Sequence, residues 1–394
     1  TTTTTTTVPT TTKTPGTREQ LLSILTEGRV ATIYETSYNS IFNRIRDNGF
    51  MKESLTGLYQ GEYVRSIGAL AILADKVGEI AAAGKTLKFV TDVMKKKNLT
   101  HVPFTISADG NTVRTEDELD GRAHFVLGWA LYVQKSGDTA YFNDTYALMK
   151  READAFCIST YFYEDVGLVR NRRLTHTRMY NGSDYHDAFD ILTNSFTAAA
   201  LEQMIAVAKK NGKETDAVLW QDTLAKLKKG IAKNLTRTVN GKTVYLEQRY
   251  FRNKTAENGV SWVCFAPFVT GYGGLDDVVL QNTATYARSV LWKKTANGGY
   301  LAVESNANGT VKNWILGKSV GWDLAAAATA GDTAHILDAL RFLEANHTGN
   351  LYMEKMQPNG STWKTIDAGN AEQVIWFLYG IAAVREAAGL SAKP

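Results

Sequence analysis

The sequence is poor in the residues that build metal sites and disulfide frameworks. Its 394 residues include two cysteines and six histidines, and no HExxH or cysteine-rich spacing occurs. Cys157 and Cys264 stand in the apolar stretches "DAFCIST" and "WVCFAP", which favours buried free thiols over a disulfide. We therefore expect no metal and no cofactor. P-loop and dinucleotide fingerprints are missing too, which argues against nucleotide-dependent enzymes.

Long apolar and long basic runs are also missing. No stretch approaches the length that a membrane span requires, and no signal peptide is visible. The net charge is +4, and the main basic runs, Lys95–Lys97 and Arg170–Arg173, are short. Runs of this length do not predict a nucleic-acid footprint. The sequence thus predicts a globular protein without nucleic-acid partners and without a membrane span.

Threonine dominates the first residues. Residues 1–16 read "TTTTTTTVPTTTKTPG", a low-complexity segment that cannot bury apolar area and is expected to form a linker or stalk for cell-surface attachment. Residues 17–394 are then expected to form a single domain. Eight Asn-X-Ser/Thr sequons follow, more than chance supplies: Asn98, Asn143, Asn181, Asn234, Asn253, Asn308, Asn346 and Asn359. Together these features predict a secreted glycoprotein, extracellular or at the cell surface.

One helical pattern recurs along the chain. A helix rich in Ala, Gly and aromatic residues ends in a turn, and a more charged helix follows. The turns fall near Gly78, Gly137, Gly212 and Gly331, and the long last interval is expected to hide a further hairpin through "DDVVLQNTATYARSVLW". An inner helix packed on all sides and an outer helix with one solvated face fit this asymmetry. The pattern predicts an all-α (α/α)6 toroid, and an open α-solenoid is the alternative.

Strand signals are few. Lys242–Phe251 alternates like a β-hairpin arm, and residues 299–314 read as a second hairpin around the Asn-Gly turn at Asn308. We expect short β-hairpin insertions at one rim of the toroid.

Acids, arginine and tryptophan gather where the chain enters the inner helices. In a toroid these entries converge on one central pocket. Carboxylates and aromatic rings on one rim suit sugar binding and glycoside hydrolysis. Five such entries are readable: Tyr59–Ser66, Thr115–His124, Asn181–Asp190, Gly317–Asp323 and Tyr352–Asn370.

The second entry, "TEDELDGRAH", holds four acids. Helix capping and the helix dipole account for Glu116, Asp117 and Glu118. Asp120 lies inside the first helical turn, beside like charges and an apolar helix, where its pKa should be raised as a general acid requires.

Three segments resemble the exo-α-1,6-mannosidases of glycoside hydrolase family 125, which share a clan with the glucoamylases. They are "DELDGRAHFVLGWALYVQKSGDTAYF", "GEYVRSIGALAIL" and "LYMEKMQPNGSTWKTIDAGNAEQVIWFLYGIAAV". The resemblance implies Asp120 as general acid, Arg65 in the substrate pocket and Glu354 as the base that activates water. It supports an inverting, exo-acting glycosidase of the six-hairpin type, acting on an oligosaccharide or polysaccharide, without naming the sugar.

Further candidates lie on the same rim. Glu372 is the substitute base, and Glu62 either pairs with Arg65 on the helix or contacts sugar hydroxyls. Asp323 is either a substrate contact or the N-cap of the alanine-rich helix. The other predicted substrate contacts are Arg122, His124, Asp187, Trp322 and Trp363, whereas Trp129, Trp262 and Trp376 are expected in the core.

Two other functions remain open. A polysaccharide lyase or unsaturated-uronide hydrolase would draw on Arg170, Arg172, Arg173, His176 and Tyr180 in "RNRRLTHTRMY". The non-catalytic alternative is an extracellular scaffold or carbohydrate-binding module.

Overall fold

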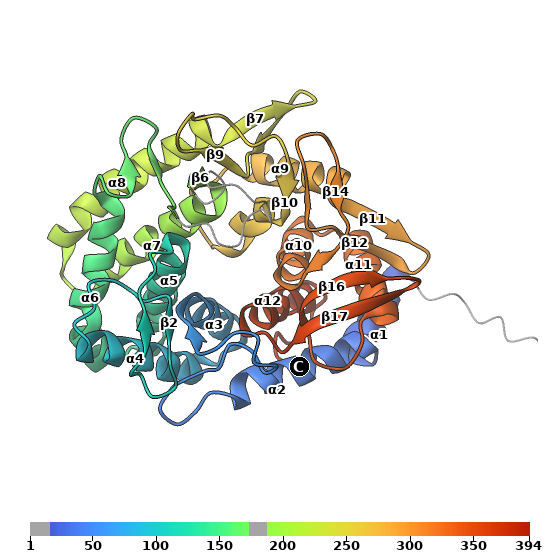
Figure 1. Ribbon diagram of the computed structural model, residues 1–394, viewed down its shortest axis with the longest axis horizontal. Helices are drawn as coiled ribbons and strands as arrows, with labels where there is room; N and C mark the ends of the chain where they lie inside the picture. The colour runs from blue at the N-terminus through green and yellow to red at the C-terminus, as the bar shows by residue number, and fades with distance from the viewer. Residues whose placement is uncertain (1–15, 173–186) are drawn as a thin grey trace, which may run out of the picture.

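The computed structural model describes residues 16–172 and 187–394, and within them twelve α-helices and one long 3₁₀ helix form two concentric layers (Figure 1). The inner layer consists of α3 (Val64–Val77), α5 (Leu119–Ser136), α7 (Ile191–Lys210), the 3₁₀ helix η2 (Trp262–Val269), α10 (Gly317–Ala330) and α12 (Ala371–Ala387). The outer layer consists of α2 (Arg29–Asn43), α4 (Ile80–Lys96), α6 (Thr139–Cys157), α8 (Glu214–Asn234), α9 (Asp277–Leu291) and α11 (Thr333–Asn346), with α1 (Thr17–Thr26) packed on α11.

The inner layer is a closed ring. Each inner element packs on the next, from α3 through α5, α7, η2 and α10 to α12, and α12 packs back on α3. An open solenoid would lack this last contact. The (α/α)6 toroid predicted from the sequence is therefore confirmed, and the open solenoid is excluded. Whether residues 17–394 form the whole domain stays a prediction, because residues 1–15 lie outside the described part of the chain.

Inner and outer helices differ in burial as the sequence pattern predicts. In α7, 15 of 20 residues are buried, whereas in α8 only 6 of 21 are. Small residues let the inner helices approach closely: a Cβ atom on Gly68 of α3 would lie 2.3 Å from the carbonyl carbon of His124 in α5. The turns at Gly78, Gly137, Gly212 and Gly331 all adopt positive φ, between 66° and 75°. Glycine adopts this conformation without steric cost.

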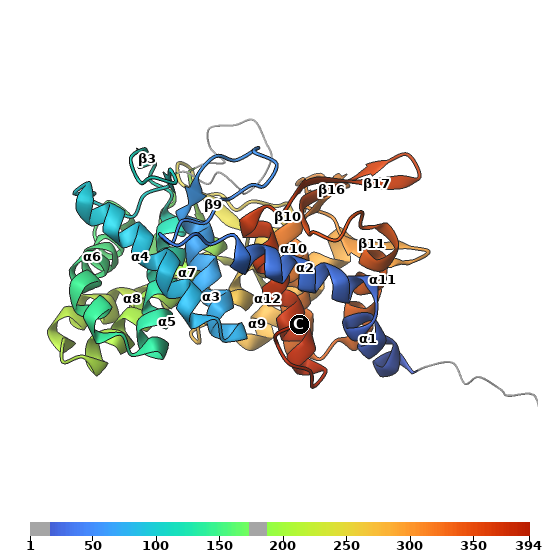
Figure 2. The ribbon, with the colours of Figure 1, turned by 90° about the horizontal axis from the view of Figure 1, so that it is seen from below.

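Short strands surround the rim where the inner helices begin (Figure 2). Strand β1 leads into α3, β6 into α7, β10 into η2, β15 into α10 and β17 into α12. The sheets are β1-β2-β3, β10-β13-β14, β15-β16-β17 and four two-stranded pairs, β4-β5, β6-β9, β7-β8 and β11-β12. Their bounds are β1 (Glu62–Tyr63), β2 (Thr105–Ile106), β3 (Val113–Arg114), β4 (Phe162–Tyr163), β5 (Leu168–Val169), β6 (Ala188–Asp190), β7 (Thr236–Val239), β8 (Lys242–Tyr245), β9 (Gln248–Tyr250), β10 (Val260–Ser261), β11 (Trp292–Thr295), β12 (Gly298–Leu301), β13 (Glu304–Ser305), β14 (Val311–Lys312), β15 (Ile315–Leu316), β16 (Met353–Asn359) and β17 (Thr362–Ala368).

The predicted hairpins are partly corrected. The hairpin around Asn308 forms as β13 and β14. The predicted arm Lys242–Phe251 is divided instead: β8 pairs back to β7, and β9 pairs with β6. The expected hidden helix is α9, but its inner partner η2 was not predicted, because "WVCFAPFV" contains Pro267 and folds as a 3₁₀ helix.

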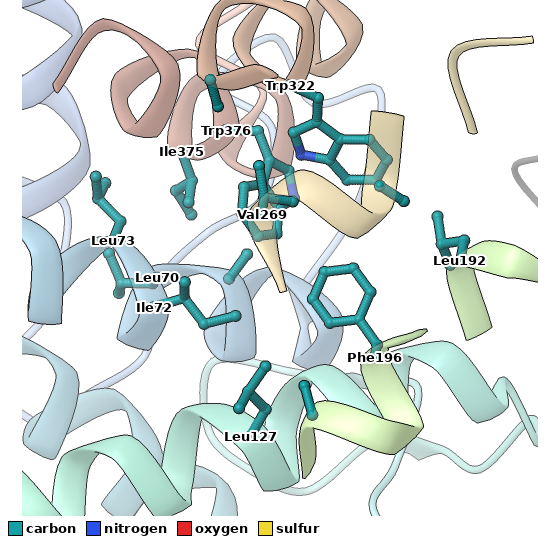
Figure 3. Packing of buried hydrophobic residues seen from close by; sticks show 14 of the residues in the cluster. Leu70, Ile72, Leu73, Leu127, Leu192, Phe196, Val269, Trp322, Ile375 and Trp376 are labelled. Carbon is teal, nitrogen blue, oxygen red and sulfur yellow. The ribbon is translucent and has the colours of Figure 1, made fainter. Parts of the chain in front are cut away.

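Aromatic side chains fill the axis of the ring. Figure 3 shows Phe196, Trp322 and Trp376 converging from three inner helices. The Trp322 and Trp376 ring centroids lie 5.5 Å apart, and those of Phe196 and Trp376 lie 6.1 Å apart. Aromatic rings therefore fill the axis of the ring at this level.

Helix α7 is long and apolar enough to cross a membrane, which the sequence analysis did not anticipate. Of its most apolar 18-residue window, 83% is buried inside the ring. No other helix in the described residues meets that test. Both cysteines are free, as predicted, and Cys264 is buried.

Candidate active site

A cavity of about 380 Å³ opens at the rim that carries the short strands. It lies where α3, α10 and α12 begin, and the sheet β15-β16-β17 forms one side. Charged and aromatic side chains share its lining. The acids are Glu53, Glu304, Glu354 and Glu372; the cations are Arg65, Arg114, Lys318 and Lys355; the aromatic residues are Tyr59, Tyr63, Phe104, Trp262 and Trp314.

Arg65 joins the first turns of three inner helices. It forms a bidentate pair with Glu372 of α12, with Nε–Oε1 at 3.1 Å and Nη2–Oε2 at 2.9 Å. Its Nη1 atom lies 2.8 Å from Glu118 and 3.7 Å from Asp120 at the start of α5. Burial alone would lower the pKa of Arg65, but the carboxylates of Glu118, Glu372 and Asp120 outweigh it and hold that pKa well above its ordinary value. Arg65 is therefore a fixed cation at the base of the cavity.

Lys318 adds a second cation to Glu372. Its Nζ atom lies 2.6 Å from Glu372 Oε1 and 4.6 Å from the centre of the Trp262 ring. Burial lowers the pKa of Lys318, and the charge of Glu372 opposes this shift. Because Glu372 is held by both Arg65 and Lys318, it is a poor proton acceptor. The arrangement disfavours Glu372 as the substitute base.

Glu53 is the buried acid that the sequence analysis missed. It lines the cavity with 4% of its surface exposed, accepts a hydrogen bond from the backbone N–H of Glu372 at 3.1 Å, and also bonds to Ser66. Burial, with the charge of Glu372 second, raises the pKa of Glu53 to about 7. The carboxyl is thus held partly protonated near neutral pH. No periodic pattern marks the loop "MKESLTGLYQ". The one signal that could have identified Glu53 is the position of this loop before the first inner helix.

Glu354 lies on β16 and lines the same cavity. Tyr59 donates its hydroxyl to Glu354 Oε1 at 2.9 Å. The second oxygen, Oε2, is buried and has no hydrogen-bond partner within residues 16–172 and 187–394. Burial raises the pKa of Glu354, against the lowering effect of the Tyr59 hydrogen bond. One carboxylate oxygen is therefore fixed, and the other is available to a water or a hydroxyl.

Asp120, the predicted general acid, lies below the cavity. It is fully buried in the first turn of α5, where Asn171 donates to its Oδ1 atom at 3.0 Å and Arg65 lies above it. Among the described residues that line the cavity, Asp120 is absent, whereas Glu354 is present. Glu118 also departs from its predicted role: it makes no side-chain cap and pairs with Arg65.

Two further residues that were predicted to contact substrate, Glu62 and Arg122, form other interactions. Glu62 lies in β1, not on the helix beside Arg65, and accepts from the Met51 N–H at 2.5 Å. Arg122 faces the outer layer, where it pairs with Glu152 at 2.8 Å and Asp117 at 2.7 Å.

His124 stacks on Phe196 in the aromatic centre of the ring, at 3.6 Å between centroids. Burial lowers its pKa to about 3. Neither it nor Glu62 or Arg122 lines the cavity among the described residues, so substrate contact by them has no support in the geometry.

The remaining predicted contacts are also corrected. Trp322 is buried between Trp262 and Trp376, below the cavity. Asp323 is not a cap, because α10 already begins at Gly317. Its carboxylate ties α10 to the outer layer through Arg288 at 2.8 Å and His335 at 2.7 Å.

Trp363 and Asp187 lie outside the cavity lining as well. Trp363 packs on Tyr300 and Phe342, at 4.8 and 5.1 Å between centroids. Asp187 forms a bidentate pair with Arg170, at 2.5 and 2.6 Å. Trp262 is buried in the core, as expected, and together with Trp314 it is also among the residues that line the cavity, beside Lys318.

The alternative lyase residues are only partly placed. Arg170 is engaged by Asp187, and Arg172 is exposed. Arg173, His176 and Tyr180 lie outside the described residues. In the described part of the chain, no group of three or more His, Cys, Asp or Glu side chains could hold a metal ion.

Comparison with solved structures gives the same fold. A structure described as a wild-type glycosidase matches with a TM-score of 0.68 at 15% identity, covering 93% of this chain and 98% of that chain. A metal-independent α-mannosidase from Streptococcus pneumoniae, in a non-productive complex with α-1,6-mannobiose, matches with a TM-score of 0.64 at 13% identity over 92% and 97%. A bacterial glucoamylase complexed with acarbose matches with a TM-score of 0.58 at 14% identity over 84% and 50%.

These similarities establish the architecture. No family model matches the sequence, and no curated protein matches it either. At 13–15% identity the solved structures show the fold alone, and this fold is the one that the resemblance of the three sequence segments implied. The roles of individual residues rest on the geometry of the cavity.

Proposed function

We propose that this protein is a glycoside hydrolase that acts on oligosaccharides from one end, with inversion at the anomeric carbon. The observation that carries the proposal is that two carboxyl groups in different environments, Glu53 and Glu354, line the same cavity. An inverting glycosidase needs one protonated and one ionised carboxyl on opposite sides of the scissile bond. The likeness of the fold to glycosidase structures supports the same reading.

Glu354 is proposed as the general base. Its Tyr59-held carboxylate presents one oxygen without a partner among the described residues, and this oxygen can accept a proton from water. That water attacks the anomeric carbon while the bond from this carbon to the glycosidic oxygen breaks. The water becomes the new hydroxyl of the sugar.

For the general acid, the geometry favours Glu53 over Asp120. Glu53 lines the cavity, and its raised pKa keeps a proton available near neutral pH. It donates that proton to the departing glycosidic oxygen. Asp120 lies behind Arg65, so we assign it a positioning role: it helps to fix the guanidinium that the sugar meets.

The charged cluster and the rings supply binding. Arg65 and Lys318, held by Glu372, present N–H groups to sugar hydroxyls. Trp314, half-buried at the cavity wall, offers a flat apolar face for a sugar ring. Binding of this kind orients the glycosidic bond between the two carboxyls.

The test is a screen on α-mannosides, α- and β-glucosides and unsaturated uronides, with the product anomer followed by NMR. We expect hydrolysis of a saturated glycoside with inversion. Glu354→Gln and Glu53→Gln should each lower kcat by about 10²–10⁴-fold, whereas the surface variant Lys229→Gln should match wild type. Asp120→Asn should lower kcat by less than Glu354→Gln or Glu53→Gln does.

Retention of configuration would refute the two-carboxyl assignment. A new C=C absorbance band would indicate a lyase in its place. Turnover that survives in both Glu variants would refute the assignment of Glu53 and Glu354, and the absence of turnover on every substrate would leave the scaffold or carbohydrate-binding function.

We further propose an extracellular location. Five sequon asparagines are exposed in the structure, so their side chains are open to glycosylation: Asn98, Asn143, Asn253, Asn308 and Asn359. A loss of mass after enzymatic removal of N-glycans from the protein of its native source would support this. An unmodified mass would refute the glycoprotein part of the proposal.

A further inference from the structure

A second cleft of about 640 Å³ adjoins the candidate active site. Tyr63 and Arg114 line both hollows, so the two are neighbours that share this wall. The second cleft is formed by the loop between α2 and α3 and by the strands β2 and β3, which project on the rim side of the ring (Figure 2). A substrate held at Glu354 could extend along Tyr63 into this space.

The charge of the second cleft differs from that of the first. The charged residues that line it are Arg46, Lys52 and Arg114, and no acid is among its lining residues. Arg114 is held by Glu116 and by the Phe104 ring, at 5.1 Å. Across the described ranges, no acidic side chain lies within ion-pair distance of Arg46 or Lys52. The first cavity, by contrast, balances four cations with four acids.

Arg46 is exposed, and two contacts restrict its position. The Arg46 guanidinium lies 5.0 Å from the centre of the Phe50 ring, and Phe50 is buried. The backbone of Arg46 is closed into a turn, because its N–H donates to the Phe50 carbonyl at 3.0 Å. A guanidinium oriented in this way is suited to hold a carboxylate or sulfate with two parallel hydrogen bonds.

We propose that this cleft binds the leaving-group side of the substrate, and that this part of the substrate carries a negative charge. The inference rests on the proposed function and narrows its substrate class to oligosaccharides with an acidic unit next to the bond that is cut. Arg46 and Lys52 contact the anionic group, while the neutral sugar to be released lies in the first cavity. The second cleft thus selects substrates whose leaving group carries a negative charge.

The experiment compares sugars that differ in one carboxylate. Maltose and α-1,6-mannobiose are each paired with the aldonate obtained by oxidising the reducing end, and binding is measured by calorimetry on the intact Glu354→Gln protein. We expect at least one aldonate to bind about tenfold more tightly than its neutral parent, with a preference that weakens at high salt. Adding Arg46→Gln and Lys52→Gln to the Glu354→Gln protein should bring the ratio of aldonate affinity to neutral-sugar affinity close to one. Adding the matched surface changes Lys229→Gln and Lys242→Gln should leave that ratio as it is in the Glu354→Gln protein.

The outcomes separate this inference from the proposed function. Equal affinity within both pairs, or no binding of either aldonate, overturns the inference even if the wild-type protein hydrolyses neutral sugars. Charge-dependent binding without turnover of any sugar by the wild type supports an anion-binding cleft, but it overturns both the proposed function and the leaving-group role of the cleft. Equal tightness for inorganic sulfate and the aldonate would show an isolated anion site and would also overturn the inference.

Discussion

Arg65 and Glu372 face each other from the first turns of the first and the last inner helix, joined by two hydrogen bonds of 3.1 and 2.9 Å. The pair closes the ring at the level of the cavity, and Glu118 and Lys318 complete it on either side. The Arg65–Glu372 pair therefore both joins α3 to α12 and positions the charged groups of the candidate site. Several consequences of this arrangement can be measured.

Removing the guanidinium should destabilise the protein strongly. Arg65→Gln leaves Glu118 and Glu372 buried with less compensating charge, which costs about 3–5 kcal/mol. Arg65→Lys keeps the charge but loses the bidentate geometry, and it should cost less. Urea unfolding at pH 7 measures both, with the exposed Arg18→Gln as control. An Arg65→Gln protein as stable as the control would show that the cluster is not a structural support.

Activity should fall as the pH rises through about 7. If Glu53 is the acid, it acts only in its protonated form, and its pKa is raised to about 7. The wild-type kcat/KM, which reports the pKa values of the free protein, should therefore decline above that pH, with a tenfold loss for each further unit. The residual activity of Glu53→Gln should lack this decline. An unchanged alkaline limb in Glu53→Gln would assign it to another group, and Asp120→Asn would then be tested in the same way.

Stability should decrease between about pH 4 and pH 7 because of Asp190. Burial foremost, and then the charge of Asp120, raise the pKa of Asp190 to about 7 in the folded protein from an ordinary value of 3.8. The folded state then retains a proton that the unfolded state releases, so the contribution is full below pH 4 and is lost as the pH approaches 7.

The matched variant is Asp190→Asn, which can still accept the capping hydrogen bond from the Thr193 N–H. Its unfolding free energy should depend less on pH over that range, by an amount on the order of a few kcal/mol. Denaturant titrations at pH 4.5, 6 and 8 provide the measurement. Parallel pH curves for variant and wild type would refute the prediction.

Adding one methyl group between α10 and α12 should destabilise the ring. A Cβ atom on Gly380 would lie 2.2 Å from the carbonyl oxygen of Gly321, so the helices would have to move apart. Gly380→Ala should cost about 1–3 kcal/mol. Gly273→Ala is the control, since the nearest atom to its Cβ would be 3.9 Å away and its φ is not positive. Equal thermal midpoints for the two variants would contradict close backbone packing here.

The architecture could be predicted from the sequence because local signals repeat. The glycine turns, the alternation of small-residue and charged helices, and the rim on which hairpins gather all follow from composition over ten to twenty residues. Element η2 could not be predicted, because its apolar run with Pro267 has no helical period. The segment Gly317–Asp323 was expected to be the entry to the alanine-rich helix, but α10 already begins at Gly317, so Asp323 lies inside the helix and away from the cavity lining.

The site was harder to predict than the fold. Arg65 and Glu354, two of the predicted site residues, line the cavity, because each lies in an entry segment to an inner helix. Glu53 and Lys318 depend on contacts between segments about 320 and 50 residues apart, which no local pattern encodes. The direction of a side chain around a helix start also decides its role. Asp120 and Arg122, two residues apart, face Arg65 and the outer layer respectively.

The closure of α12 onto α3 has a consequence for how the protein is made. On the ribosome, α3 emerges roughly three hundred residues before α12, the helix that covers its flank. A long apolar surface of α3 therefore stays uncovered during most of synthesis. A chaperone that shields apolar helices would bind α3 at this stage. A product terminated before Ala371 would keep the surface of α3 exposed, and proteases would remove it before it accumulated as a partly active protein.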